Sequence, residues 1–229
     1  VRGADDALLL SLAGVDMRPV TIVGVETFDV GEIRTLAQML DLATQPIVGT
    51  EGNDSLVGTD VAEEIDALAG DDTIIGGGGA DTIDGGPGRD LLSFEGATGR
   101  VVFREGTGTG PDGSEFSFTG VEDFTGGDGI DSFRDTAGDN HLRGLAGDDA
   151  FRAGLTGIDV FDGGAGSDRV SYSSEWSALT ANLLSGRGEA GASVGDSYIS
   201  IERLTGGRGS DLLIGDNAAN EIHSGGGDD

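Results

Sequence analysis

The sequence predicts an all-β fold, a parallel β-roll made of nine-residue repeats with strand-rich interruptions between blocks of them. Three observations carry this prediction. The chain has 229 residues, of which 44 are glycine. Glycine and aspartate recur with a period of nine, as in GGGGADTID and GGPGRDLLS at residues 76–93. One large apolar residue stands at the eighth place of each repeat. A short, fixed period of this kind is typical of a solenoid.

The period divides the chain into blocks and interruptions. Both interruptions end alike, in FTGVEDFTGG and ISIERLTGG, and IVGVETF at 22–28 resembles the same closing strand. We therefore expect the N-terminal part to be the end of a preceding module, and the whole chain to be a fragment. Residues 31–42 show helical apolar spacing, which indicates a short amphipathic helix or a covering loop. The predicted segments are 1–48 (preceding module and helix), 49–93 (first block), 94–125 (interruption), 126–171 (second block), 172–205 (interruption) and 206–229 (third block).

Each repeat is expected to form a turn followed by a short strand. Glycine at places one, two and four permits positive φ and close backbone approach, which suits a tight turn over the first six residues. The last three places suffice only for a short strand, in which side chains alternate and place eight points inward. The expected inward set is Leu56, Ile65, Ile74, Ile83, Leu92, Phe133, Leu142, Phe151, Phe161, Val170, Leu213 and Ile222.

Two repeats make one coil of 18 residues, so the turns of every second repeat stack on one edge. The aspartates at place six then stack as well, about 4.8 Å apart. At an effective dielectric constant of 20, two such charges repel by about 3 kcal/mol. A divalent cation relieves this repulsion, and carboxylate and carbonyl oxygens without sulfur or imidazole favour calcium. The small core also predicts that the array folds only with metal.

The composition excludes several classes of function. The chain carries 42 acidic and 13 basic residues, a formal net charge of −29, which disfavours nucleic acid and anionic membranes as partners. Cysteine and lysine are absent, and no apolar run reaches membrane-spanning length. The strict nine-residue phase argues against a disordered linker. The repetition, without a following GK[ST], argues against a nucleotide-binding loop.

Paired carboxylates and histidines are candidates for catalytic or zinc-binding groups. Asp71–Asp72 and Asp148–Asp149 fall in phase as a turn ligand and its neighbour, which is a better interpretation than acid/base catalysis. His141 and His223 are expected at the surface, because no HExxH motif accompanies them.

Two further sets of side chains allow more than one interpretation. Arg134, Arg143 and Arg152 all occupy place nine, where they form a solvated face or neutralise surplus carboxylates. The aromatic side chains of the second interruption form a small core or, less readily, a platform for stacking a sugar. These are Tyr172, Trp176 and Tyr198.

The repeated pattern GGxGxDxUx, in which U is a large aliphatic residue, resembles the RTX or hemolysin-type calcium-binding repeat. The resemblance covers the three blocks. It implies a parallel β-roll, calcium held between successive turns, and export by type I secretion from a Gram-negative bacterium to the outside or the cell surface. We expect about four to six calcium ions, no catalytic residue and no membrane insertion by this chain.

The resemblance also assigns ligands by position. Asp54 is paired with Asp72 and Asp72 with Asp90; Asp131 is paired with Asp149 and Asp149 with Asp168. Asp81 faces a degenerate repeat with Asp60 and Glu63, where Val61 replaces a turn glycine. Asp159 faces Asn140, beside the extra Thr156, and Asp211 faces Asp229. Backbone carbonyls complete the set: Gly49, Glu51, Ala67, Ala69, Gly70, Gly76, Gly78, Gly79, Gly86, Gly88, Gly126, Asp128, Gly144, Ala146, Gly147, Gly164 and Gly166.

Three functions stay open on the sequence alone. The first is a calcium-dependent folding and secretion module of a larger exported protein. The second is an adhesin or surface-layer segment whose interruptions bind carbohydrate or another cell. The third is the non-catalytic C-terminal part of a secreted protease, lipase or epimerase, since such enzymes carry these repeats.

Overall fold

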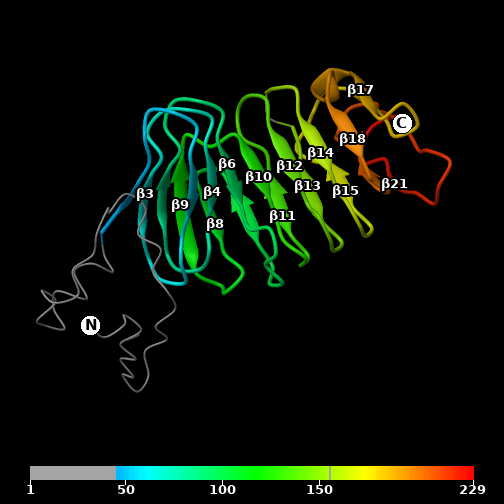
Figure 1. Ribbon diagram of the computed structural model, residues 1–229. Coiled ribbons are helices and arrows are strands. Elements are labelled where there is room, and N and C mark those ends of the chain that lie inside the picture. Colours follow the sequence, from blue (N-terminus) through cyan, green and yellow to red (C-terminus); the bar gives the residue numbers. More distant parts are fainter. Residues whose placement is uncertain (1–44, 155) are drawn as a thin grey trace, which may run out of the picture.

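The computed structural model describes residues 45–154 and 156–229, which form a two-walled roll of short strands (Figure 1). The expected helix at 31–42 and the closing strand at 22–28 lie outside the described residues. Outside the two interruptions, the strands of the chain alternate between the two walls, so every second strand lies in the same wall. In the described part of the chain, no helix is long and apolar enough to cross a membrane.

The first sheet has 11 strands. In spatial order they are β1 (Ile47–Val48), β3 (Glu64–Asp66), β5 (Thr82–Asp84), β9 (Glu115–Thr119), β8 (Thr107–Thr109), β7 (Val102–Arg104), β11 (Ser132–Arg134), β13 (Ala150–Arg152), β15 (Arg169–Ser171), β19 (Arg203–Thr205) and β21 (Glu221–His223).

The second sheet has 10 strands. In spatial order they are β2 (Ser55–Val57), β4 (Thr73–Ile75), β6 (Leu91–Ser93), β10 (Asp123–Thr125), β12 (His141–Arg143), β14 (Val160–Asp162), β18 (Ser197–Ile199), β17 (Arg187–Ala190), β16 (Thr180–Asn182) and β20 (Leu212–Ile214). A 3₁₀ turn, η1 (Gly191–Ser193), follows β17.

The register is the one that the nine-residue period predicts. Leu56 pairs with Ile74 and Ile74 with Leu92, in parallel and without slippage. Each step along a sheet therefore advances the chain by one coil of two repeats, and equivalent places of the repeat lie above one another. The predicted parallel β-roll is confirmed.

The core is the row of place-eight side chains between the two sheets. Ten of the twelve expected inward residues are buried. The expectation is wrong for Ile222, which is 40% exposed, and holds only in part for the half-buried Leu213. Both lie on the last strand of their sheet, β21 and β20, where a neighbouring coil covers one side only.

The interruptions are antiparallel meanders that keep the roll continuous. In the first, β7, β8 and β9 pair in antiparallel fashion between β5 and β11 of the first sheet, while the second sheet receives β10 alone. In the second, β16, β17 and β18 do the same between β14 and β20 of the second sheet, while the first sheet receives β19 alone. Each interruption thus inserts two extra strands, and the two meanders lie in opposite walls.

Candidate metal centre

The side chains at place six form two columns, one at the beginning of each sheet's strands. In the second sheet, Oδ1 of Asp72 accepts the backbone N–H of Asp54 at 2.7 Å, and Oδ1 of Asp90 accepts that of Asp72 at 2.8 Å. Oε2 of Glu122 then accepts the N–H of Asp90 at 3.0 Å. One oxygen of each carboxylate is therefore fixed by the preceding coil.

The first sheet repeats this arrangement along the second block. Oδ1 of Asp131 accepts the N–H of Val101, Oδ1 of Asp149 that of Asp131, and Oδ1 of Asp168 that of Asp149, each at 2.7 Å. Oε2 of Glu202 accepts the N–H of Asp168 at 2.9 Å and continues the column. The columns therefore place consecutive carboxylates one coil apart.

The second carboxylate oxygen is the unusual feature of the columns. Oδ2 of Asp72, Asp90, Asp149 and Asp168 is buried and has no hydrogen-bond partner among residues 45–154 and 156–229. These four residues are at most 1% exposed. Burial of a charged acceptor without a partner costs several kcal/mol of folding free energy. Proteins therefore retain such a group where a cation or a hydrogen-bond donor satisfies it.

Burial changes the acidity of the column. Desolvation, reinforced by the neighbouring carboxylates of Asp131 and Asp168, raises the pKa of Asp149 to about 7. Desolvation and the charges of Asp72 and Glu122 raise the pKa of Asp90 to about 6, and a similar environment raises that of Asp168 to about 6. In the absence of a cation, these sites therefore hold a proton more readily than an ordinary aspartate.

Glycine at place one leaves room beside the unpartnered oxygen. A Cβ at Gly144 would overlap Oδ2 of Asp149 in its own turn and would approach the carbonyl oxygen of Gly163 in the next coil to 2.7 Å. The missing side chain thus leaves a carboxylate oxygen and a carbonyl oxygen facing the same small space. At place four, Gly88 has φ +157 and its missing Cβ would overlap the carbonyl oxygen of Gly70.

This donor set suits a hard cation that takes most of its ligands from the backbone. Among the described residues, no group of three or more His, Cys, Asp or Glu side chains converges on one point. A cage here would therefore combine carboxylates of successive coils with turn carbonyls, and calcium accepts such irregular sets of six to eight oxygens. The residues present fit calcium in their chemistry.

Other predicted pairs are held differently. Oδ1 of Asp81 accepts the N–H of Glu63 at 3.0 Å, while Oε2 and Oε1 of Glu63 are bound by the backbone N–H and hydroxyl of Thr59. Asp60 lies in the neighbouring turn, near Gly78. At the other end, Oδ1 of Asp229 accepts the N–H of Asp211 at 2.9 Å, so these two residues are brought together as predicted.

The Asn140 coil satisfies itself with hydrogen bonds inside the protein. Oδ1 of Asp159 accepts the N–H of Asn140 at 2.9 Å. The Asn140 amide donates to the carbonyl of Glu122 and to the hydroxyl of Thr136, both at 2.8 Å, and its oxygen accepts the Thr136 N–H. The Asn140 side chain therefore has hydrogen-bond partners inside the protein, unlike the Oδ2 atoms of the aspartates named above.

In the next coil of this column, a tyrosine hydroxyl donates to the second carboxylate oxygen. Oδ1 of Asp196 accepts the N–H of Asp159 at 2.9 Å, and Oδ2 of Asp196 accepts the Tyr172 hydroxyl at 2.6 Å. The Tyr172 and Tyr198 hydroxyls lie 2.7 Å apart. Tyr172 and Tyr198 are buried, which matches the small core considered for the second interruption.

Three members of the columns were missed by the sequence prediction: Glu122, Glu202 and Asp196. Glu122 and Glu202 belong to the similar closing motifs, GVEDFTGG and IERLTGG. In these motifs EDFT and ERLT correspond to places six to nine of a degenerate repeat, and the glycine pair begins the next repeat. The recurrence of glutamate before both closing strands was the available signal. Asp196 lies between strands of a meander, where the nine-residue phase is lost.

The carboxylates at place five have a different role from their neighbours at place six. Oδ1 of Asp71 accepts the N–H of Arg89, and Oδ1 of Asp148 accepts the N–H of Ser167. They therefore link adjacent turns through the backbone. The interpretation of Asp71 and Asp148 as neighbours of a ligand agrees with this geometry.

The other singled-out side chains lie at the surface or in ion pairs. Trp176 is 73% exposed, and the guanidinium of Arg208 covers its ring at 4.2 Å. It stands apart from the buried tyrosines, so the three aromatic residues do not form one platform. His223 is exposed as expected and lies 2.8 Å from Glu221. The expected surface position is wrong for His141, which is half-buried because it lies on β12 inside the second sheet.

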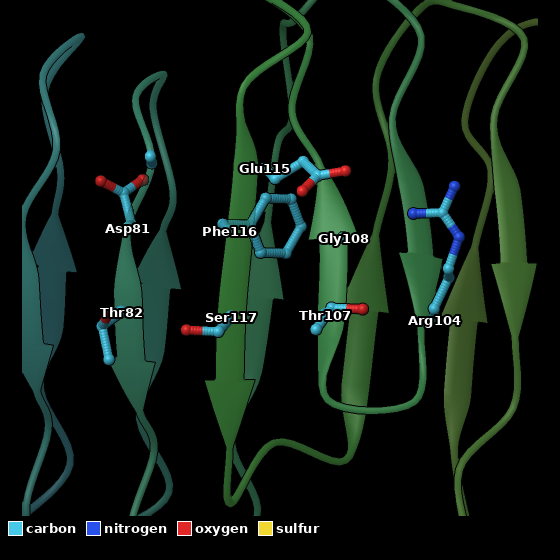
Figure 2. Close-up of a pocket in the computed structure, with 9 residues that line it drawn as sticks. Asp81, Thr82, Arg104, Thr107, Gly108, Glu115, Phe116 and Ser117 are labelled. Atoms are coloured by element: carbon cyan, nitrogen blue, oxygen red, sulfur yellow. The ribbon is translucent and has the colours of Figure 1, made fainter.

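A groove of about 370 Å³ lies over β5, β7, β8 and β9 (Figure 2). Asp81, Glu115 and Arg104 contribute charges of both signs to its lining. Figure 2 shows the Phe116 ring beside Gly108, but Phe116 is only 3% exposed. The ring therefore offers little surface to a ligand.

The family model of the RTX calcium-binding nonapeptide repeat matches residues 47–60, 57–92, 125–156, 153–174 and 199–229, more than half of the chain. The chain belongs to this family. The RTX resemblance deduced from the repeats is thereby confirmed, and calcium binding is the established property of the repeat itself.

No curated protein matches this RTX chain. Among solved structures, a similar chain is the extracellular lipase LipA from Serratia marcescens, at 18% sequence identity and a TM-score of 0.31. The similarity covers 77% of the RTX chain and 33% of the lipase chain, so the RTX chain spans about a third of the length of the lipase.

Proposed function

We propose that this chain is a calcium-dependent folding module of a larger exported protein. The observation that carries the proposal is the set of buried, unpartnered Oδ2 atoms of Asp72, Asp90, Asp149 and Asp168. Beside Asp90, Asp149 and Asp168, the glycine at place one of the turn leaves the carboxylate oxygen close to a carbonyl oxygen of the next coil. Calcium bound between coils would neutralise these carboxylates and join successive turns.

The proposed ions lie between turns one coil apart. We assign the firmest sites to the pairs Asp72–Asp90 and Asp149–Asp168, in which both members have an unpartnered oxygen. Asp54–Asp72 and Asp131–Asp149 are the next, because one oxygen of Asp54 is held by Thr50 and one of Asp131 by Gly127. With Asp81 and Asp211 as further candidates, the total is about four to six ions. The predicted turn carbonyls are the remaining ligands.

The negative net charge of the chain bears on where this module folds. At a formal net charge of −29, repulsion favours the open chain wherever calcium is scarce. We propose that the chain crosses the envelope of a Gram-negative bacterium unfolded, by type I secretion, and folds outside, where calcium is abundant. The chain itself would not be an enzyme; any catalytic activity would reside in other parts of the parent protein. The described similarity to an extracellular lipase is compatible with such a parent.

A calcium titration followed by circular dichroism tests this function. In excess chelator we expect the β signal to be largely absent, and to appear cooperatively as calcium approaches the millimolar range typical of extracellular modules. Each site bound at 100 times its dissociation constant adds about 2.7 kcal/mol of stability. A full β signal in excess chelator would overturn the proposal.

Magnesium provides the matched control ion. It requires near-ideal octahedral geometry and gives up its water reluctantly, whereas stacked carbonyl turns are irregular. We expect magnesium to leave the chain largely unfolded at concentrations at which calcium folds it. Equal folding by the two ions would argue for simple charge screening instead of defined sites.

A further inference from the structure

The outer face of the first sheet carries a group of arginines on neighbouring strands. Arg134 of β11 pairs in register with Arg152 of β13, and Arg169 of β15 pairs with Arg203 of β19. Arg104 ends β7, which lies next to β11. Like charges placed opposite each other on adjacent strands destabilise a sheet, so this arrangement calls for a counter-charge.

The protein does not supply that counter-charge to most of the group. Within the described residues, arginine forms ion pairs at Arg89–Asp123, Arg143–Asp162 and Arg203–Glu221. No carboxylate of the described chain reaches ion-pair distance of Arg104, Arg134, Arg152 or Arg169. The chain has 42 acidic residues against 13 basic ones, so this is a matter of placement and not of a shortage of carboxylates.

A hollow of about 290 Å³ lies on this face over β11, β13 and β15. Two arginines, three serines and two apolar residues line it. These are Arg152 and Arg169, then Ser132, Ser171 and Ser173, and finally Ala150 and Phe151. Every polar side chain of this lining can donate a hydrogen bond, and none is a carboxylate.

The guanidinium groups of Arg152 and Arg169 each have a donor nitrogen that no acceptor of the described residues satisfies. The Arg152 guanidinium donates to Oγ of Ser174, from Nη2 at 2.7 Å and from Nε at 3.2 Å, which fixes its plane and leaves Nη1 without a hydrogen bond to the described residues. Nε of Arg169 is buried and has no acceptor in the part of the chain that the structure describes. A buried charged donor without an acceptor is costly, so an acceptor from outside the chain is favoured here.

We propose that this hollow binds a tetrahedral oxyanion, a sulfate or phosphate group, between Arg152 and Arg169. Arginine presents a planar fork of donors that matches such oxygens, and the serine hydroxyls add neutral donors around it. Arg134 and Arg104 extend the positive charge along the roll, about 4.8 Å per strand. A ligand that carries several such groups would therefore engage more than one arginine.

We expect anion binding at this site to depend on calcium, because the two strands that carry Arg152 and Arg169 begin next to carboxylates of the column. β13 begins directly after Asp149, and β15 begins directly after Asp168. If calcium neutralises these carboxylates, as the proposed function holds, their repulsion of an anion on the same strands is removed. The site is therefore tested on protein saturated with calcium, and folding is checked separately by circular dichroism.

Inorganic sulfate is the probe, because phosphate precipitates with calcium. Isothermal titration of sodium sulfate at constant ionic strength should show binding to the unaltered chain, weakened about tenfold or more in Arg152→Gln and Arg169→Gln. Arg143→Gln is the matched control. It also occupies place nine, but it lies on the second sheet, 3.8 Å from Asp162, and should bind sulfate like the unaltered chain.

A second arm uses dextran sulfate and separates a free ion from a group carried on a polymer. Sulfate binding that is lost in both hollow variants supports the proposal with the free ion sufficient. Binding of the polymer alone, weakened by Arg152→Gln and further by adding Arg134→Gln, supports it with a polymer-borne group. Binding of neither probe to calcium-folded protein, or equal weakening by Arg143→Gln, would overturn it.

Discussion

Asp72 illustrates what a single residue contributes to this roll. Its Oδ1 accepts the N–H of Asp54, its own N–H is held by Asp90, and its Oδ2 is buried without a partner. It therefore stands between two proposed ions, whereas its neighbour Asp71 binds a backbone N–H and is exposed.

Replacing Asp72 should raise the calcium requirement for folding. We expect Asp72→Ala to move the midpoint of the calcium titration upward several-fold, since one ligand is lost from two sites. Asp71→Ala, its neighbour, should move it much less, and Asp159→Ala should also have a smaller effect because Asn140 replaces the partner carboxylate. The measurement is circular dichroism during a calcium titration. Equal shifts for Asp72→Ala and Asp71→Ala would show that only overall charge matters.

The raised pKa values predict a particular dependence on pH. With a folded-state pKa of about 7 for Asp149 and about 6 for Asp90 and Asp168, the metal-free fold binds protons that the unfolded chain releases above about pH 4. These groups therefore favour the metal-free fold at low pH and stop doing so as the pH rises through about 6 to 7. In chelator, the β signal should be stronger at pH 5.5 than at pH 7.5.

Protons and calcium compete for the same oxygens, so the calcium midpoint should rise as the pH falls. At pH 5.5 more calcium should be needed to saturate the sites than at pH 7.5, as measured by isothermal titration at both values. A midpoint independent of pH would mean that the buried carboxylates do not bind the ion.

At the scale of the element, several turns of the roll require a positive φ at place two, and in two of them a leucine adopts this unfavourable conformation. In these turns place two adopts the left-handed region, with φ +91 at Gly164, φ +71 at Leu68 and φ +76 at Leu145. For a residue with a Cβ this conformation costs about 1–2 kcal/mol. Leu145→Gly should therefore raise the free energy of unfolding in saturating calcium, by up to about 1 kcal/mol once the added freedom of the unfolded chain is counted.

Leu212→Gly is the control for that change, because Leu212 is 56% exposed within β20 and needs no positive φ. There the substitution should lower the stability, by about 0.5–1 kcal/mol. Chemical denaturation of both variants provides the comparison. A loss of stability in Leu145→Gly equal to that in Leu212→Gly would show that the turn is not strained.

The repeats could be predicted from the sequence because each is a local pattern. Period nine determines the strand, its inward residue and the stacking of place six, and Leu56, Ile74 and Leu92 lie as expected. The meanders could not be predicted in the same way. Their order in the sheet depends on contacts such as that of Tyr172 with Asp196, which only the folded chain brings together.

At the scale of the whole molecule, the aromatic residues concentrate where the repeats stop. The rings of Phe94, Phe103, Phe116, Phe118 and Phe124 contact one another around the first meander, with centroids 5.1 to 6.2 Å apart. Such pairs stabilise a core beyond the area that they bury. The first meander therefore adds an aromatic cluster to the row of place-eight side chains.

Folding should change the size of the molecule strongly. An unfolded chain of this length has a radius of gyration of about 52 Å, and a compact globule one of about 17 Å, with an elongated roll somewhat larger. Small-angle scattering should show this contraction on the addition of calcium, at the same concentration at which the β signal appears. Contraction without β signal would indicate ion-induced collapse instead of assembly of the roll.

The placement of the two meanders in opposite walls has a geometric consequence. Between β5 and β11 the first sheet has two strands more than the facing stretch from β6 to β12, which at the usual strand spacing is a difference of about 10 Å in sheet length. Between β14 and β20 the excess lies in the second sheet. The two interruptions therefore lengthen opposite walls of the roll by two strands each, so the extra length that the first sheet gains at the first interruption is matched by the second sheet at the second.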